Sequence, residues 1–318
     1  MRIHEETLVL SQHRFKGWIL DALWRESSSA LQLSPTGVYL FSSETKNRAL
    51  SQFKRFHRLL SKPVLSIHQS NLNLLEAIGM IEKCNNHNVI ITHINPEENL
   101  HYLSNHFAIN KNLRFLTMNK NTKMQLMALG IPQESVSVIY GAIDRKVFRP
   151  SEEAIQGSYI LIGGDCKPRK NPAMIRELVL NNPDLKFVFE GYAWKKFFSD
   201  IVQFNANISF WDRGTLSLGD LYRNASVLCN LSLLEGGPIP VLQALASGTP
   251  ILSSDVGFVS EVLAEDFGRV INLDLTIQEI SVMLREVAST KRLVSTKDGL
   301  EGKFSWEDLG RNLFAFAD

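Results

Sequence analysis

The sequence lacks the features that mark secreted, membrane-spanning or metal-stapled proteins. Only three of its 318 residues are cysteines, Cys84, Cys166 and Cys229, and no two of them form a CxxC pair. This spacing predicts neither a disulfide framework nor a zinc site, and it indicates a reducing compartment. No window reaches the roughly 18 uninterrupted apolar residues of a spanning helix, and the opening MRIHEETLVLSQHR has no apolar stretch of the signal-peptide type. We therefore expect a cytoplasmic protein.

Net charge is also nearly absent, since 34 Lys+Arg face 33 Asp+Glu. The 44% of hydrophobic residues excludes a disordered, collagenous or coiled-coil chain. The total conceals a division, because residues 1–150 carry 18 basic and 11 acidic side chains while residues 151–318 carry 16 and 22. All eight histidines lie in the first half, so any imidazole chemistry must come from there. This uneven distribution of charge and histidine can also reflect nothing more than compositional drift between two domains. We do not expect a nucleic-acid partner, because the chain has neither a strong net positive charge nor a recognised nucleic-acid-binding motif.

Short β-branched or aromatic runs alternate with stretches of helical periodicity, which predicts βαβ units and parallel sheets. In the second half the expected strands are 158–163, 185–190, 208–211, 227–231, 250–253 and 269–272, and the expected helices are 171–180, 241–246 and 277–287. The first half is less regular, with expected strands at 7–11, 38–41, 63–68, 89–92, 114–118 and 137–140. We predict an α/β protein of two Rossmann-like domains. A linker is expected at 141–151, because this segment contains a cluster of charged residues and Pro150.

The loops that leave the carboxyl ends of parallel strands are where ligands bind, so candidate residues are sought there. One such loop begins with Gly163 and Gly164 and continues through Lys167, Arg169 and Lys170 to a predicted helix. Backbone N–H groups, the helix dipole and three cations would all favour a phosphate at this place. The alternative is an ordinary turn whose cations are only solvated.

The loop 234–243, LEGGPIPVLQ, is the most informative stretch of the chain. Glu235 follows a predicted strand, and Gly236 and Gly237 lead into a helix. A carboxylate beside an anion-binding helix N-terminus suits a sugar diphosphate, which needs N–H donors for its phosphates and an acceptor for its hydroxyls. Alternatively, Glu235 caps the helix and the glycines only permit a tight turn. The next such loop, 253–257, is expected to support the other two.

The segment EGGPIPVLQALASGTPILSSDVGFVSEVL, residues 235–263, resembles the signature of the group 1 glycosyltransferases of GT-B fold, the retaining family 4. The similarity extends to 163–171 and 130–150, whereas residues 1 to about 110 match only in pieces, which indicates a divergent N-terminal domain. Residues 304–307 resemble the start of the last helix of those enzymes.

The resemblance implies two Rossmann-like domains that face each other across a cleft. It assigns 1–150 to an acceptor-binding domain, 151–303 to a nucleotide-sugar-binding domain, and 304–318 to a C-terminal helix that crosses back to the first domain. It also implies that neither a metal nor a cofactor is needed beyond the nucleotide-diphosphate sugar, which is the donor substrate.

Carried over residue by residue, the resemblance makes Lys170 the group that neutralises the leaving phosphate and Glu235 the acceptor for hydroxyls of the sugar. The implied donor-binding residues are Gly163, Gly164, Lys167, Arg169, Gly191, Gly236, Gly237, Pro238, Ile239 and Gln243. Two departures stand out, because the family usually has a glutamate at the place of Gln243 and an arginine near Gly164. Either Lys167 or Arg169 supplies the missing cation, or donor binding is weakened.

In the first half, VIITHINP resembles the strand-end His-x-x-Pro segment of the family, which makes His93 the third catalytic candidate; a structural histidine is the alternative. The acceptor-side candidates are His13, Lys16, Gly17 and His68. Residues 46–62, KNRALSQFKRFHRLLSK, form a basic amphipathic pattern. This pattern is typical of a peripheral membrane contact or a pocket for an anionic lipid acceptor, or else of a helix packed on the sheet with a solvated cationic back.

These observations predict a hexosyltransferase-type glycosyltransferase. It would move a sugar from a nucleotide-diphosphate sugar to a glycan or lipid-linked saccharide acceptor, with retention and without a metal, in bacterial surface polysaccharide synthesis. We expect it in the cytoplasm or on the inner face of the membrane. The main alternative is a catalytically degenerate GT-B protein that acts as a nucleotide-binding or partner subunit, and a sugar-nucleotide epimerase of similar fold is a weaker third.

Overall fold

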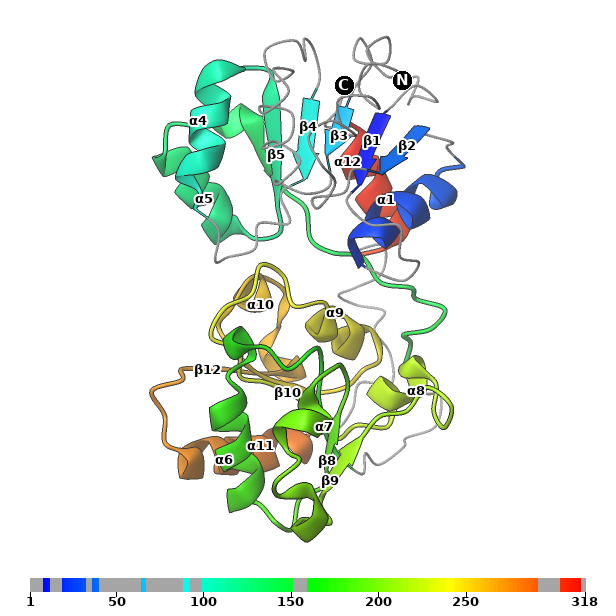
Figure 1. The fold of residues 1–318 in the computed structure, drawn as a ribbon, viewed down its shortest axis with the longest axis vertical. Helices are drawn as coiled ribbons and strands as arrows, with labels where there is room; N and C mark the ends of the chain where they lie inside the picture. The colour runs from blue at the N-terminus through cyan, green and yellow to red at the C-terminus, as the bar shows by residue number, and fades with distance from the viewer. Residues whose placement is uncertain are drawn as a thin grey trace. The chain divides into compact units, whose positions relative to one another are not determined.

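The computed structural model describes residues 8–11, 19–32, 36–39, 64–66, 88–91, 99–150, 159–290 and 304–315. The chain divides into two compact units, Met1–Ala142 with Phe304–Asp318, and Ile143–Lys303. Each unit is built on one six-stranded sheet whose paired strands all run parallel, with helices against it (Figure 1). This arrangement confirms the predicted α/β class. Within the described residues no helix is long and apolar enough to cross a membrane.

The sheet of the first unit has the strand order β2-β1-β3-β4-β5-β6. Its strands are β1 (Leu8–Ser11), β2 (Thr36–Tyr39), β3 (Val64–Ser66), β4 (Asn88–Ile91), β5 (Leu113–Thr117) and β6 (Val136–Val138). Its helices are α1 (Ile19–Ala30), α4 (His101–Ile109), α5 (Lys120–Ala128), the 3₁₀ turn η3 (Gln133–Ser135) and α12 (Trp306–Ala315). Every strand predicted for this half overlaps an observed one.

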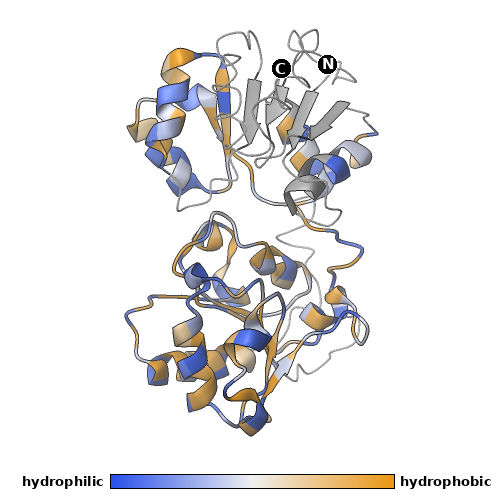
Figure 2. Ribbon diagram, viewed as in Figure 1, coloured by the Kyte–Doolittle hydropathy of each residue, from blue (hydrophilic) through white to orange (hydrophobic). Residues whose placement is uncertain are grey.

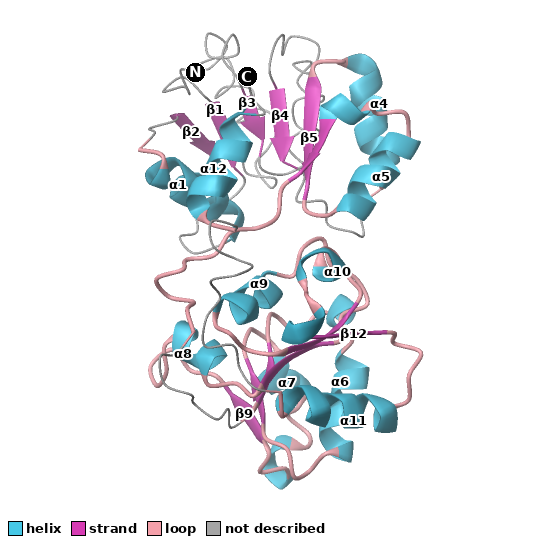
Figure 3. Cartoon of the chain, turned by 180° about the vertical axis from the view of Figure 1, so that it is seen from behind, coloured by secondary structure: helices cyan, strands magenta, loops and turns pink. Residues whose placement is uncertain are grey.

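Helix α12 belongs to the first unit, although the second unit separates it in sequence from the rest of that unit. Ser305 starts the helix, because its hydroxyl accepts the backbone N–H of Asp308 at 3.0 Å. The helix packs against α1 (Figure 3). Gly310 allows the close approach, since a Cβ there would lie 3.0 Å from the carbonyl oxygen of Ser27. The predicted return of the last helix to the first domain is therefore observed.

The sheet of the second unit has the order β12-β11-β10-β7-β8-β9. Its strands are β7 (Ile160–Ile162), β8 (Phe187–Phe189), β9 (Ile208–Phe210), β10 (Val227–Asn230), β11 (Ile251–Ser254) and β12 (Gly268–Ile271). Its helices are α6 (Pro172–Asn181), α7 (Trp194–Phe197), α8 (Leu218–Arg223), α9 (Ile239–Ala246), α10 (Val259–Val262) and α11 (Ile277–Ala288), with 3₁₀ turns η4 (Pro168–Lys170), η5 (Val202–Phe204) and η6 (Glu265–Phe267).

Strands β7 and β10 are neighbours in this sheet although β8 and β9 lie between them in sequence. The strand order reverses at this pair, so the loops that leave the two strands start side by side at the carboxyl edge of the sheet. Open α/β sheets bind their ligands at such a switch point. The fold therefore brings the loop after β7 and the loop after β10 to one place.

The core of the second unit is apolar on both faces of the sheet. Phe187 and Phe189 of β8 are fully buried, and the ring of Phe189 lies 5.0 Å from that of Trp194 at the start of α7. Helix α11 buries Ile280 and Leu284, which stand four residues apart on one face. Figure 2 shows the helices of this unit with both hydrophobic and hydrophilic residues, as expected for helices that cover a sheet. The buried sheet thus supports the loops at its carboxyl edge.

The segment that precedes β7 is attached to the second unit by α8. The ring of Phe148 meets the Tyr222 ring edge-on at 5.5 Å, and the Arg223 guanidinium donates to the carbonyl of Arg149 at 2.9 Å. The part of the expected linker around Phe148 is therefore packed structure, while residues 151–158 lie outside the described residues.

Candidate functional site

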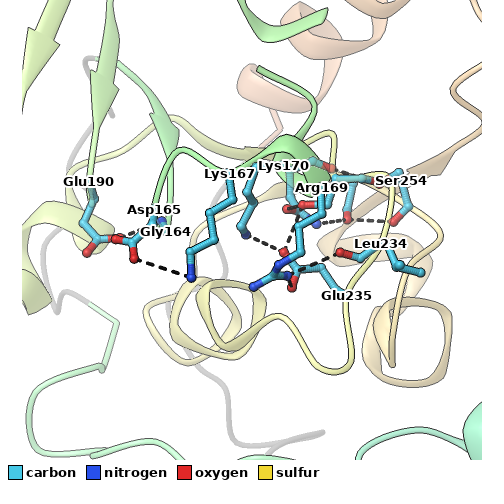
Figure 4. A network of polar contacts seen from close by, with 12 residues as sticks. Gly164, Asp165, Lys167, Arg169, Lys170, Glu190, Leu234, Glu235 and Ser254 are labelled. Carbon is cyan, nitrogen blue, oxygen red and sulfur yellow. Dashed lines mark hydrogen bonds and ion pairs between the residues drawn. The ribbon is translucent and has the colours of Figure 1, made fainter. Parts of the chain in front are cut away.

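Lys170 and Glu235, predicted from separate loops, are in contact. Lys170 ends η4 after β7, and its Nζ lies 2.7 Å from Glu235 Oε1. The Arg169 guanidinium pairs with Glu235 Oε2 and donates to the carbonyl of Leu234 at 3.3 Å (Figure 4). The backbone joins the same loops, since the N–H of Leu233 donates to the carbonyl of Arg169 at 2.8 Å. Two cations and one carboxylate thus form the centre of the site.

The Glu235 carboxylate is held in its charged form. Burial would raise the pKa of Glu235, but the charges of Lys170 and Arg169 and their hydrogen bonds outweigh burial and lower that pKa below its usual range. The side chains of Lys170 and Glu235 are only 8% and 7% exposed. Buried charges of this kind depend on each other, because removing one leaves the others uncompensated.

In the loop after β7, the backbone N–H of Gly164 is bonded to a side chain of the protein. Gly164 has a left-handed backbone, with φ of 90°, and its N–H donates to Glu190 Oε2 at 2.8 Å. Its carbonyl accepts the indole N–H of Trp194 at 2.7 Å. A Cβ at Gly164 would lie 3.2 Å from Lys170 Nζ, so the glycine also makes room for the lysine. Gly163, buried just before it, faces the hydroxyl of Tyr222.

Glu190 is a site residue that sequence reasoning missed. Burial, the largest effect, raises its pKa, with a further contribution from the negative charge of Asp165. The signal was present, because an acidic residue directly follows the apolar strand β8 at the edge where ligands bind.

Lys167 and Gly191 complete the region around this loop. Lys167 is exposed, and its Nζ lies 4.0 Å from Asp165 Oδ2. Asp165 in turn accepts the N–H of Tyr192 at 2.9 Å. Gly191 lies beside the loop after β7, with a left-handed φ of 112°. Lys167 is thus the cation of this loop that is most open to solvent.

The loop after β10 does not use Glu235 as a helix cap. Helix α9 begins after Pro238, and no side chain caps it, so the capping alternative is wrong. Gly236 and Gly237 lie half-buried before the helix, Pro238 is buried, and Ile239 opens the first turn. Gln243 is half-buried one turn later on the same helix.

The end of β11 and the loop that follows it support the loop after β10, as the sequence indicated for residues 253–257. Ser254 Oγ donates to the carbonyl of Ser232 at 2.6 Å. Gly257 has a left-handed φ of 59°, and a Cβ there would lie 2.9 Å from both the carbonyl oxygen of Gly236 and Cδ of Pro238. These contacts fix the backbone that carries Glu235.

The remaining candidates, His93, His13, Lys16, Gly17 and His68 and the segment 46–62, lie outside the described residues. Of the described histidines, His106 is buried in α4, and its Nδ1 lies 2.7 Å from the carbonyl of Tyr102. Across the ranges that the structure describes, no group of three or more His, Cys, Asp or Glu side chains could hold a metal ion.

Comparison with known proteins finds a family that most of the second unit resembles. Residues 144–291 match the family described as "Glycosyl transferases group 1". A curated relative, the MMP alpha-(1->4)-mannosyltransferase of Mycolicibacterium hassiacum, is 28% identical over 159 residues. That match covers 44% of this chain and 36% of the relative, so the chain aligns with little more than a third of the relative's length.

Solved structures with a similar fold align with nearly the full length of the chain. Sucrose-phosphate synthase from Thermosynechococcus elongatus has a TM-score of 0.75 at 14% identity, covering 97% of this chain and 99% of that one. Anabaena Alr3699/HepE in complex with UDP and glucose has a TM-score of 0.73 at 12% identity, covering 98% of each chain. The lipopolysaccharide outer core galactosyltransferase WaaB has a TM-score of 0.68 at 16% identity, covering 98% of each.

Proposed function

We propose that this protein, whose residues 144–291 match the family of group 1 glycosyl transferases, transfers a sugar from a nucleotide-diphosphate sugar to a glycan or lipid-linked acceptor. The anomeric configuration is retained, as in family 4, and no metal ion takes part. The product belongs to bacterial surface polysaccharide, and the reaction takes place on the cytoplasmic side of the membrane. The similarity to WaaB, a lipopolysaccharide galactosyltransferase, supports this setting.

The contact between Lys170 and Glu235 at the switch point of the sheet is the observation that carries the proposal. Transfer breaks the bond between the anomeric carbon and a phosphate oxygen, and the electron pair stays on the leaving diphosphate. Fixed cations at that oxygen stabilise the transition state more than the ground state. Lys170 and Arg169 are two such cations, and the carboxylate between them belongs to Glu235.

The same geometry supports a role for Glu235 in binding the sugar. In the structure its two oxygens are engaged by Lys170 and Arg169. A donor diphosphate carries enough negative charge to draw both cations to itself, and the carboxylate oxygens then accept hydrogen bonds from sugar hydroxyls. Donor binding therefore replaces the ion pairs of Glu235 with two new sets of contacts, one between the cations and the diphosphate and one between the carboxylate and the sugar.

A binding panel tests the donor. UDP and UDP-glucose are the first probes, because HepE has been solved with UDP and with UDP-glucose. GDP and GDP-mannose are the second pair, chosen for the mannosyltransferase relative. A probe at about 100 times its dissociation constant stabilises the folded protein by roughly 2.7 kcal/mol, which a thermal shift detects.

Variants locate the binding site. Lys170→Ala and Glu235→Ala should lose the thermal shift and the transfer of sugar to an added lipid-linked saccharide. Lys186→Ala is the matched control, because Lys186 is exposed just before β8, at the opposite edge of the sheet. Full activity in Lys170→Ala and Glu235→Ala would contradict the assignment.

A degenerate GT-B protein is the second candidate, and the loop after β7 favours it. Near Gly164, where the family has an arginine, this chain has Asp165, and Gly164 gives its N–H to Glu190. Two carboxylates thus lie where the diphosphate would bind. This candidate predicts nucleotide binding or complex formation without product, whichever acceptor is offered.

The roles proposed for the first unit rest on the sequence alone. We propose that His93 lies near the reacting sugar, that His13, Lys16, Gly17 and His68 face the acceptor, and that 46–62 contacts the membrane surface. Sedimentation with vesicles of phosphatidylglycerol and phosphatidylcholine tests the membrane contact. Sedimentation with the vesicles should be lost when the six basic residues of 46–62 are replaced by glutamine. Unchanged sedimentation of that variant would contradict the proposed membrane contact.

A further inference from the structure

A buried chain of hydrogen bonds leads from β11 to the Glu235 carboxylate. Asn230 and Ser253 stand opposite each other in the paired strands β10 and β11, and Asn230 Nδ2 donates to Ser253 Oγ at 2.9 Å. Ser253 Oγ donates its one proton to the carbonyl of Ser254 at 2.8 Å. It therefore has to accept from the amide, which fixes Nδ2 toward Ser253. The amide oxygen of Asn230, which only accepts, faces Ser232.

The hydroxyl of Ser232 has two acceptors and one proton. Its Oγ lies 2.8 Å from Asn230 Oδ1 and 3.1 Å from Glu235 Oε1. The side chain is fully buried, and Ser254 holds the backbone carbonyl of Ser232 at 2.6 Å. The position of the hydroxyl oxygen is thus fixed, and only its proton can turn, either to the amide or to the carboxylate.

The charge around Glu235 decides which acceptor takes that proton. With Lys170 and Arg169 on the carboxylate, we expect the proton on the nearer acceptor, Asn230 Oδ1. When a diphosphate draws the two cations away, the carboxylate stays buried and needs other donors, because an unpaired buried charge is costly.

We propose that Ser232 is a positioning residue that donates to Glu235 when the sugar is bound, with Asn230 as the acceptor that holds its proton otherwise. This inference rests on the proposed donor site. Ser232 then acts on the sugar only through Glu235 and has no part in binding the nucleotide. Its loss should weaken the preference for a nucleotide sugar over the matching nucleoside diphosphate.

Isothermal titration of the full chain with UDP and UDP-glucose, and with GDP and GDP-mannose, measures that preference as a ratio of dissociation constants. In Ser232→Ala the ratio should fall about tenfold, the size of one hydrogen bond to a charged group. Asn230→Leu removes the competing acceptor and keeps the branching of the side chain, so the preference should persist or grow.

Thr249→Val is the matched control. It removes a fully buried hydroxyl that donates to the carbonyl of Tyr222 at 2.6 Å and has no link to Glu235. A general loss of stability affects both ligands of a pair alike and cancels in the ratio, so a purely structural role of Ser232 would leave the ratio unchanged.

The outcomes separate the two proposals. An unchanged ratio in Ser232→Ala, or an equal fall in Thr249→Val, overturns the role of Ser232 and leaves the donor site intact. A fall in Asn230→Leu as large as in Ser232→Ala overturns the competition between the two acceptors. If the unmodified protein binds none of the four probes, the proposed function fails first and the inference fails with it.

Discussion

Gly191 and Gly164 touch at the carboxyl edge of the second sheet. A Cβ built on Gly191 would lie 2.5 Å from both the carbonyl carbon and the carbonyl oxygen of Gly164, and the φ of Gly191 is 112°. No side chain fits between these backbones, and L-residues rarely adopt that φ. The loop after β7 is thus held in place by the loop after β8.

Gly191→Ala should therefore lower the free energy of unfolding by about 1 to 3 kcal/mol, the cost of a strained backbone, and weaken nucleotide binding together with it. Urea denaturation measures the first effect and thermal shift the second. Gly214→Ala is the control, because a Cβ at Gly214 would lie 3.6 Å from its nearest neighbour, which is ordinary contact. Equal stability of the two variants would show that the loop after β7 tolerates displacement.

Glu235→Gln should destabilise the protein by about 3 kcal/mol, because Lys170 and Arg169 would lose their carboxylate. The pKa of Glu235 is lowered in the folded state, so its contribution is complete above the unfolded pKa of about 4.3 and is lost as the pH falls through the folded value. Urea denaturation from pH 7 to pH 3 should show a steeper loss in the unmodified protein than in Glu235→Gln. Parallel curves would mean that the carboxylate is not held by the two cations.

Glu190→Gln should have the opposite effect and stabilise the protein at pH 7. Burial raises the pKa of Glu190, so the unfolded chain ionises first as the pH rises, and the charged form then counts against folding. Glutamine still accepts the N–H of Gly164. The advantage should shrink as the pH falls from the folded pKa toward the unfolded one near 4.3 and vanish below it. Urea denaturation at pH 7 and pH 4 measures this. A stability gain that is independent of pH would have to come from packing instead of charge.

Cys229 should resist alkylation in the folded protein. It lies buried in β10, and burial raises its pKa to about 12, so almost no thiolate forms near neutral pH. Cys166 is half-buried on the loop after β7 and serves as an internal reference, with a pKa that burial also raises. Iodoacetamide at pH 8 followed by peptide mass spectrometry should label Cys166 before Cys229. Early labelling of Cys229 would show that β10 opens.

The sequence was sufficient to predict the strands of both sheets and to select the loops that carry Lys170 and Glu235, because periodicity and loop position follow directly from the residues. It was not sufficient to predict the partners of Gly164 or the chain of bonds through Asn230 and Ser232. Those depend on which strands become neighbours, and the pairing of β7 with β10 is not visible in a single strand. The polar residues Asn230 and Ser232 in an otherwise apolar run were the one local sign of that network.

The neighbourhood of β7 and β10 also bears on how the protein folds. Arg169 and Glu235 meet across 66 positions of sequence, and the intervening chain forms β8 and β9. Contacts that close such long loops form late, because the loss of chain entropy comes before the contact that compensates it. The cluster of Lys170, Arg169 and Glu235 therefore forms only after β7 and β10 have paired. A refolding intermediate without this pairing would already contain local helices but would have no affinity for a nucleotide.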